Sequence, residues 1–386
     1  MSEEEKGRLP LEGVRVVEFG SLIAGPFATR IMAEFGAEVI KIEPPEGDPL
    51  RGWRKLHEGT SLWWYVQARN KKSVVANLKD KATQEDVLAL LKKADIVVEN
   101  FRPGVMEKLG LGYEVLSAQN PGLVMVRISG FGQDGPYRDQ PGFGAIGESM
   151  GGLRYITGFP DLPPVRTGIS IGDSIAGLWA VIGAQMALRH REVNGGKGQV
   201  VDVALYEAVF AMMESMVPEY DVFGFVRERT GNIMPGITPS NTHKTLDGKF
   251  ITIGANGDAI FVRCMKAIGR EDLANDPTLA NNAGRDARRV EIYGVLDAWA
   301  ARTESAEALA LLTAAEVPVS KVYSIEDMFA DPQFLARGML EQAHLPNGEA
   351  FRIPGIVPKL SGTPGITKWL GPALGSTGLK AVLRGK

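Results

Sequence analysis

The sequence VRVVEFGSLIAGPFATRIMAEFGAEVIKI, residues 14–42, contains two strand-like segments on either side of a helical one. Residues 14–19 and 37–42 are short and rich in Val and Ile, whereas residues 26–35 carry apolar side chains at helical spacing. Two strands joined by a helix form a βαβ unit, in which the strands run parallel. This stretch therefore predicts an α/β fold built on a parallel sheet.

The same alternation continues along the first half of the chain. Further strands are predicted at residues 73–78, 95–98, 123–128 and 199–205, and further helices at residues 83–93 and 206–217. Ligands of open parallel sheets bind beyond the carboxyl ends of the strands, so we expect the functional site at that edge.

The amino-acid composition of the sequence changes near residue 225. Residues 223–239 are rich in Gly, Pro, Asn and Thr, which indicates a linker or loop. Shorter strand and helix patterns follow, and the tail contains repeated prolines. We therefore expect a large domain made of residues 1–224 and 326–386, with a smaller α+β domain made of residues 225–325.

Composition limits the class of partner. The 386 residues include 43 basic and 46 acidic side chains, a balance that argues against nucleic acid or an anionic membrane as the main partner. A single cysteine, Cys264, and four histidines offer no zinc-binding spacing, so no metal is expected. The N-terminus is polar, and the longest apolar run, residues 175–188, is too short to span a membrane. We expect a cytoplasmic protein that does not bind nucleic acid or membranes.

Two short motifs point to other functions but lack the right context. GFGQDG, residues 130–135, matches the dinucleotide-binding fingerprint, yet prolines follow where that fingerprint requires a helix. GESMG, residues 147–151, matches the nucleophile elbow of serine hydrolases, yet the residues before it form a poor strand. We therefore favour neither a dinucleotide site nor a serine hydrolase that would pair Ser149 with His190, His243 or His344.

Asp173 stands at the start of a long apolar helical pattern in RTGISIGDSIAGLWAVIGAQMALRHR, residues 166–191. A helix N-terminus stabilises a carboxylate, and free N–H groups near Gly172 and Ser174 could also stabilise an oxyanion. Two interpretations stay open here. Asp173 is either a helix N-cap, a position that Asp favours, or a nucleophile assisted by the end of the helix.

Basic residues gather near the ends of the predicted strands. Arg69 and Lys71 precede one strand, and Lys79 follows it. Asn100 and Arg102 follow another strand. Carboxyl ends of parallel strands share one edge, so Lys79, Asn100 and Arg102 would meet there and suit a phosphorylated cofactor. The alternative is a solvated basic surface.

Long, ordered blocks carry a more specific signal. They run from LEGVRVVEFGSLIAGPFATRIMAEFGAEVIKIEPPEGDPLRGW through NKKSV, ADIVVENFRPGVMEKLGLGYE, ISGFGQDGPY and TGISIGDSIAG to GGKGQVVDVALYEAV. These blocks resemble the class III CoA-transferases, which include formyl-CoA, carnitine and succinyl-CoA:dicarboxylate transferases. The resemblance implies that Asp173 is the catalytic aspartate, which forms acyl-aspartyl anhydride and aspartyl-CoA thioester intermediates. It implies coenzyme A and acyl-CoA as substrates, with no tightly bound cofactor and no metal.

The resemblance also implies contacts with coenzyme A and an assembly. The implied contact residues are Ile23, Ala24, Ala76, Asn77, Leu78, Lys79, Asn100, Phe101, Arg102 and Lys108. The implied fold has a Rossmann-like large domain built from both chain ends and a smaller α+β domain, and two chains form an interlocked homodimer.

Alternatives within this fold remain. Racemases of 2-methylacyl-CoA share it but carry a His and an Asp where this chain has PGFG, residues 141–144, and another acyl-CoA-binding enzyme is also possible. Oxalate-using members carry a run of glycines where this chain has GNIMPGITPSN, residues 231–241. The resemblance therefore favours a transferase of the dicarboxylate branch, with succinyl-CoA as the expected donor.

Overall fold

The computed structural model describes residues 8–384, which form two compact units. The larger unit contains the residues up to 154, residues 166–226 and the residues from 337 onward. The smaller unit contains residues 155–165 and 227–336. We had expected residues 155–165 in the large domain and the return to that domain at residue 326.

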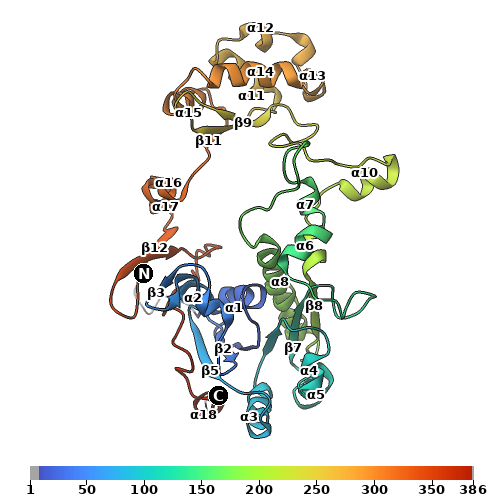
Figure 1. The fold of residues 1–386 in the computed structure, drawn as a ribbon, viewed down its shortest axis with the longest axis vertical. Helices are drawn as coiled ribbons and strands as arrows, with labels where there is room; N and C mark the ends of the chain where they lie inside the picture. The colour runs from blue at the N-terminus through green and yellow to red at the C-terminus, as the bar shows by residue number, and fades with distance from the viewer. Residues whose placement is uncertain (1–7, 385–386) are drawn as a thin grey trace. The chain divides into compact units, whose positions relative to one another are not determined.

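A six-stranded, fully parallel sheet forms the centre of the larger unit, in the order β5-β2-β1-β6-β7-β8. Figure 1 labels β5, β2, β7 and β8 of this sheet. Its strands are β1 (Arg15–Glu18), β2 (Glu38–Glu43), β5 (Lys71–Val75), β6 (Ile96–Glu99), β7 (Val124–Ser129) and β8 (Val200–Ala204). The sheet confirms the predicted α/β class and its six predicted strands.

Helices cover both faces of this sheet. Val16 of β1 packs in one core cluster with α1 (Ala24–Glu34) and α8 (Ile171–Val193). The next residue, Val17, packs in a second cluster with α3 (Lys81–Leu91). Because both faces are covered, the strands are rich in Val and Ile on both sides, although charged residues such as Glu18 and Lys41 interrupt them. The C-terminal helix α18 (Leu379–Arg384) packs against α3, so the end of the chain returns to the larger unit (Figure 1).

Helix α8 carries Asp173 and packs closely on α1. A side chain at Gly177 would come within 2.8 Å of Phe27, so the small residue permits this approach. By length and composition, α8 is also the one helix in the described part of the chain that could cross a membrane. Our expectation that no apolar segment is long enough was wrong, because the helix extends past residues 175–188 at both ends. In this fold its alanine-rich side belongs to the core.

The predicted helix at residues 206–217 is interrupted. The chain forms α9 (Leu205–Phe210) and α10 (Met216–Phe223), and Glu214 between them has a positive φ of 48°. Such a conformation is incompatible with a continuous right-handed helix. The other elements of the larger unit are β3 (Leu56–His57), β4 (Thr60–Ser61), α2 (Leu62–Gln67), α4 (Val105–Lys108), α5 (Tyr113–Gln119), α6 (Gly144–Met150), β12 (Leu340–His344) and β13 (Ala350–Pro354).

The smaller unit is an α+β structure with its own core. An antiparallel sheet in the order β11-β10-β9 packs against helices through a cluster that includes Ile251, Phe261 and Leu296. Its elements are β9 (Ser240–Lys244), β10 (Phe250–Gly254), β11 (Val319–Lys321), α11 (Asp258–Ala267), α12 (Glu271–Ala274), α13 (Asn282–Ala287), α14 (Arg289–Ala300), α15 (Ser305–Ala314), α16 (Ile325–Ala330) and α17 (Pro332–Ala336). Helix α7 (Leu153–Ile156) spans the point where the chain first enters this unit.

Candidate active site

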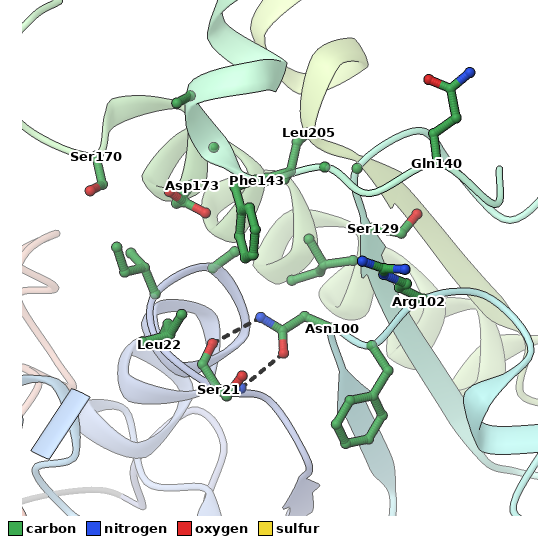
Figure 2. Close-up of a pocket in the computed structure, with 18 of the residues that line it drawn as sticks. Ser21, Leu22, Asn100, Arg102, Ser129, Gln140, Phe143, Ser170, Asp173 and Leu205 are labelled. Atoms are coloured by element: carbon green, nitrogen blue, oxygen red, sulfur yellow. Dashed lines mark hydrogen bonds between the residues drawn. The ribbon is translucent and has the colours of Figure 1, made fainter. Parts of the chain in front are cut away.

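The carboxyl ends of β1 and β6 border a cavity of about 680 Å³ in the larger unit. These two strands pair with each other although they are far apart in the sequence. The strand order of the sheet reverses at this pair, which is the position where open α/β sheets bind ligands. Residues 21–24 after β1 and residues 100–103 after β6 line the cavity (Figure 2).

Asn100 ties these two loops together. The Ser21 N–H donates to Asn100 Oδ1 over 2.8 Å, and Asn100 Nδ2 donates to the Ser21 carbonyl over 2.9 Å (Figure 2). The next residue, Leu22, has a positive φ of 63°, which is unfavourable for a leucine. Its N–H is held by the carboxylate of Asp48, at 3.1 and 3.3 Å from the two oxygens. Buried groups therefore fix the loop that forms one wall of the cavity.

A buried ionic cluster lies beneath that loop. Lys41 Nζ is 2.8 Å from Asp48 and 2.7 Å from Glu18, and it donates to the Gly20 carbonyl over 2.6 Å. Lys71 Nζ lies 2.8 Å from the other oxygen of Glu18. Although burial opposes its ionisation, Lys41 and Lys71 lower the pKa of Glu18 to about 2. Two carboxylates thus balance two ammonium groups.

Asp173 lines the same cavity from the first turn of α8 (Figure 2). The N-cap of this helix is Ser170, and no side chain caps it, so the N-cap interpretation of Asp173 was wrong. Burial raises the pKa of Asp173 from 3.8 to about 6; Glu148 adds to this rise, and Arg166 opposes it. At neutral pH the side chain is therefore mostly a carboxylate, though a poorly solvated one.

Glu148 of α6 is the buried neighbour of Asp173. Its Oε2 lies 3.2 Å from Arg154 Nη2 and 3.9 Å from Arg166 Nε. Its Oε1 accepts a 3.4 Å hydrogen bond from the Gly172 N–H. Asp173, Glu148, Arg154 and Arg166 thus form a cluster of two carboxylates and two guanidinium groups.

The backbone donors that we expected to hold an oxyanion are already occupied. The Gly172 N–H donates to Glu148, and the Ser174 N–H donates to the Ser170 carbonyl over 3.1 Å. Neither is free to bind a reacting oxygen in this conformation.

Comparison with known proteins gives the chain a family. Residues 11–377 match the family described as CoA-transferase family III. The chain belongs to this family. It is a class III CoA-transferase, as the sequence blocks had indicated.

Two curated relatives and one solved structure illustrate the match. The CoA-transferase is 49% identical over 377 residues to succinyl-CoA–D-citramalate CoA-transferase of Chloroflexus aurantiacus, covering 97% of this chain and 93% of the relative. It is 35% identical over 364 residues to succinate–glutarate CoA-transferase of Agrobacterium fabrum, covering 92% and 90%. A crystal structure of a CAIB/BAIF family protein from Brucella suis matches with a TM-score of 0.83 and 34% identity, over 96% and 97% of the two chains.

The CoA-transferase brings half of its predicted contact residues to the cavity. The residues that line it together with Asp173 are Ile23, Ala24, Asn100, Phe101 and Arg102. The predicted residues that do not line it are Ala76, Asn77, Leu78, Lys79 and Lys108. The strand order explains Lys79: β5 is an edge strand three positions from β6, about 14 Å at the usual strand spacing. Their contacts with coenzyme A stay predictions.

Several groups at the site were missed from the sequence. Arg69 and Lys71, which we had considered for a basic surface or a phosphate site, are buried in ion pairs with Glu34 and Glu18. Other cavity-lining residues that we had not singled out are Trp53, Arg54, Ser129, Gln140, Phe143, Arg166 and Ser170. Glu18 and Lys41 stand inside apolar strands, and that interruption is the signal that could have revealed the buried cluster.

The competing interpretations do not fit the CoA-transferase site. Residues 130–135 are not followed by a helix until Gly144. Ser149 lies inside α6, where its Oγ donates to the Ala145 carbonyl rather than to a histidine. A Cβ atom placed on Gly144 would overlap the Asp173 carboxylate. A side chain at Gly144, in the run where racemases carry a His and an Asp, would therefore displace the Asp173 carboxylate.

Proposed function

We propose that this CoA-transferase moves coenzyme A from succinyl-CoA to a dicarboxylic acid, with Asp173 as the nucleophile. The observation that carries the proposal is the position of Asp173, the one carboxylate among the described residues that line the cavity. The names of the two relatives support the substrate class, since one is named for succinyl-CoA and D-citramalate and the other for succinate and glutarate.

The first half-reaction breaks the thioester of the donor. An Asp173 oxygen attacks the thioester carbonyl, the carbon–sulfur bond breaks, and an acyl-aspartyl anhydride and CoA thiolate result. The thiolate then attacks the Asp173 carbonyl and releases the donor acid. The enzyme is left as an aspartyl-CoA thioester.

The second half-reaction repeats these steps in reverse. A carboxylate of the acceptor attacks the Asp173 carbonyl and displaces the thiolate, which gives a second anhydride. The thiolate attacks the acceptor carbonyl of that anhydride, releasing acceptor-CoA and the free Asp173 carboxylate. The energy of the thioester is kept throughout, so the reaction as proposed needs neither ATP nor a metal, and no cofactor is tightly bound.

For coenzyme A, we propose an extended path along the carboxyl edge of the sheet. Ile23, Ala24 and the turn formed by residues 100–102 would contact the part nearest the thioester, since they line the cavity with Asp173. Residues 76–79 and Lys108 would contact the more distant part of this long ligand. We also propose that the enzyme works in the cytoplasm.

We further propose that the enzyme is a homodimer, in the interlocked form that the family resemblance implies. An apolar face of α8 supports this, because Trp179, Ile182 and Met186 are 38, 42 and 67% exposed. These side chains border a groove of about 320 Å³ together with Val201 of β8. Soluble monomers seldom leave such a continuous apolar surface in water.

A transfer assay tests the proposed function. Wild-type enzyme is incubated with succinyl-CoA and a panel of dicarboxylic acids, and new acyl-CoA is separated by chromatography. Asp173→Ala is expected to abolish transfer while coenzyme A still binds in calorimetry, and the control Ser149→Ala is expected to retain both. Transfer by Asp173→Ala at the wild-type rate would refute the proposal. Activity on 2-methylacyl-CoA without any acceptor would indicate a racemase instead.

A further inference from the structure

The cavity contains a cation that the transfer steps do not use. Arg166 lines it together with Asp173, and 46% of its side chain is exposed. Among residues 8–384, its guanidinium donates no hydrogen bond, and its ion pair with Glu148 is long, at 3.9 Å from Nε to Oε2. A charge-assisted hydrogen bond would be about 1 Å shorter. The donors of Arg166 are therefore free for a ligand.

Glu148 does not need Arg166 as its partner. Its buried carboxylate accepts bonds from Arg154 Nη2 and Nε at 3.2 and 3.3 Å and from the Gly172 N–H. Arg154 is thus the guanidinium that satisfies the buried carboxylate. Arg166 remains the accessible one.

The net charge of the cluster formed by Asp173, Glu148, Arg154 and Arg166 changes during the reaction. In the free enzyme, Asp173 and Glu148 balance Arg154 and Arg166. Once Asp173 becomes an anhydride or a thioester, its negative charge is gone and the cluster has one excess positive charge. A ligand that supplies one carboxylate beside Arg166 restores the balance in each covalent state.

Arg166 is also a cavity cation whose charge acts on Asp173. Arg54 and Arg102 line the same cavity, but Arg166 is the one that pairs with Glu148, which accepts the N–H of Gly172, the residue next to Asp173. A carboxylate held by Arg166 would therefore belong to the acyl group, a few carbon atoms from the reacting carbonyl, rather than to coenzyme A.

We propose that Arg166 binds the second carboxylate of the dicarboxylic substrate and so sets the preference for dicarboxylic over monocarboxylic acyl groups. The planar fork of an arginine matches the two oxygens of a carboxylate, which a lysine cannot reproduce. This inference rests on the proposed function and deepens it, because it assigns the group that recognises the acid.

The test compares two donors that differ only at the far end of the acyl group. Succinyl-CoA carries a carboxylate where butyryl-CoA carries a methyl group. The rate at which each donor modifies Asp173 is followed by rapid quench and intact-mass spectrometry, for wild type, Arg166→Met and Arg166→Lys. A matched control is Arg189→Met, which removes an exposed arginine near the C-terminal end of α8 that is paired only loosely with Glu192.

Arg166→Met is expected to slow modification by succinyl-CoA about 10- to 100-fold, the factor that corresponds to a hydrogen bond between charged groups. Modification by butyryl-CoA should change less than about threefold, since the lost contact involves only the carboxylate. Arg166→Lys should keep part of the preference, and Arg189→Met should match wild type.

Three results would overturn the inference. If Arg166→Met slows modification by both donors equally, Arg166 does not recognise the carboxylate. The same follows if Arg166→Met keeps the wild-type preference for succinyl-CoA over butyryl-CoA. Wild-type enzyme that reacts equally fast with both donors would overturn the inference without any variant, which covers the case in which Arg166→Met does not fold. Failure of both donors to modify wild-type Asp173 would overturn the proposed function itself, a result distinct from these three.

Discussion

Replacing Asp173 with asparagine should stabilise the protein while it removes activity. The pKa of this carboxyl group rises from 3.8 to about 6 on folding, chiefly through burial and then through Glu148. A shift of about two pKa units corresponds to about 3 kcal/mol, and partial exposure of the side chain reduces the expected effect to about 2 kcal/mol. Asparagine has nearly the same shape and never ionises, so it removes this destabilisation.

The sign and the pH window follow from the two pKa values. Below about pH 4 the carboxyl group is protonated in both the folded and the unfolded chain, so wild type and Asp173→Asn should be equally stable. As the pH rises from about 4 to about 6, the unfolded chain ionises first, and wild type loses free energy of unfolding relative to the variant. Above pH 6 the difference should stay constant.

Thermal and urea unfolding between pH 4 and pH 7.5 measure this difference. The variant should melt a few degrees above wild type at pH 7.5, and this gap should close at pH 4. Asp202→Asn is a matched control, because burial also raises the pKa of Asp202, but its carboxylate accepts the Gln133 N–H and lies outside the Asp173 cavity. If Asp173→Asn is less stable than wild type at pH 7.5, or if the gap does not depend on pH, Asp173 is not a poorly solvated carboxylate.

The remaining predictions concern activity and assembly. The kcat/KM for acyl-CoA should rise with pH and level off above about 6, because only ionised Asp173 attacks; a profile that is flat between pH 5 and pH 7 would contradict this. Asp48→Asn should raise the KM for acyl-CoA about tenfold with a smaller change in kcat, since it weakens the hold on Leu22, and steady-state kinetics can separate the two effects. Gly144→Ala should lower kcat by at least about a hundredfold, because the added methyl group displaces the Asp173 carboxylate; retention of wild-type kcat would show that the carboxylate can move without loss. Met186→Asp should shift the protein from dimer to monomer in sedimentation velocity, and an unchanged dimer would place the interface elsewhere.

The sequence predicted the larger unit well because both of its signals are strong. Buried parallel strands are mostly apolar on both sides, so the Val- and Ile-rich residues 14–19 and 123–128 stand out from the polar segments around them. Long helices with one apolar side are equally distinct. Helix ends were less certain, as α8 shows, because the apolar pattern fades in its first and last turns.

The strand order could not be derived in the same way. Local patterns predict each strand but not its neighbours, and Lys79 was therefore expected beside Asn100 and Arg102. The sheet places β2 and β1 between the two strand ends, so Lys79 does not line the cavity. A polar residue after a strand reveals the edge of the sheet on which it lies, but not the position along that edge.

Charged groups that act through other residues were the hardest to predict. Lys71 looks like an ordinary strand lysine and Lys41 only interrupts an apolar strand, yet both are buried against Glu18. Glu148 lies inside a motif that resembled a hydrolase elbow, and Arg166 lies in an irregular stretch with no periodicity. Only the folded chain brings the last two together beside Asp173.

The most direct test of the central claim is the mass of the enzyme after exposure to succinyl-CoA. The protein is incubated with the thioester, treated with hydroxylamine and digested, and the peptides are mapped. A hydroxamate at Asp173, absent from Asp173→Asn treated in the same way, is the result that the covalent mechanism predicts. If transfer to an acceptor acid proceeds but Asp173 is never modified, the claim that this carboxylate is the nucleophile is wrong.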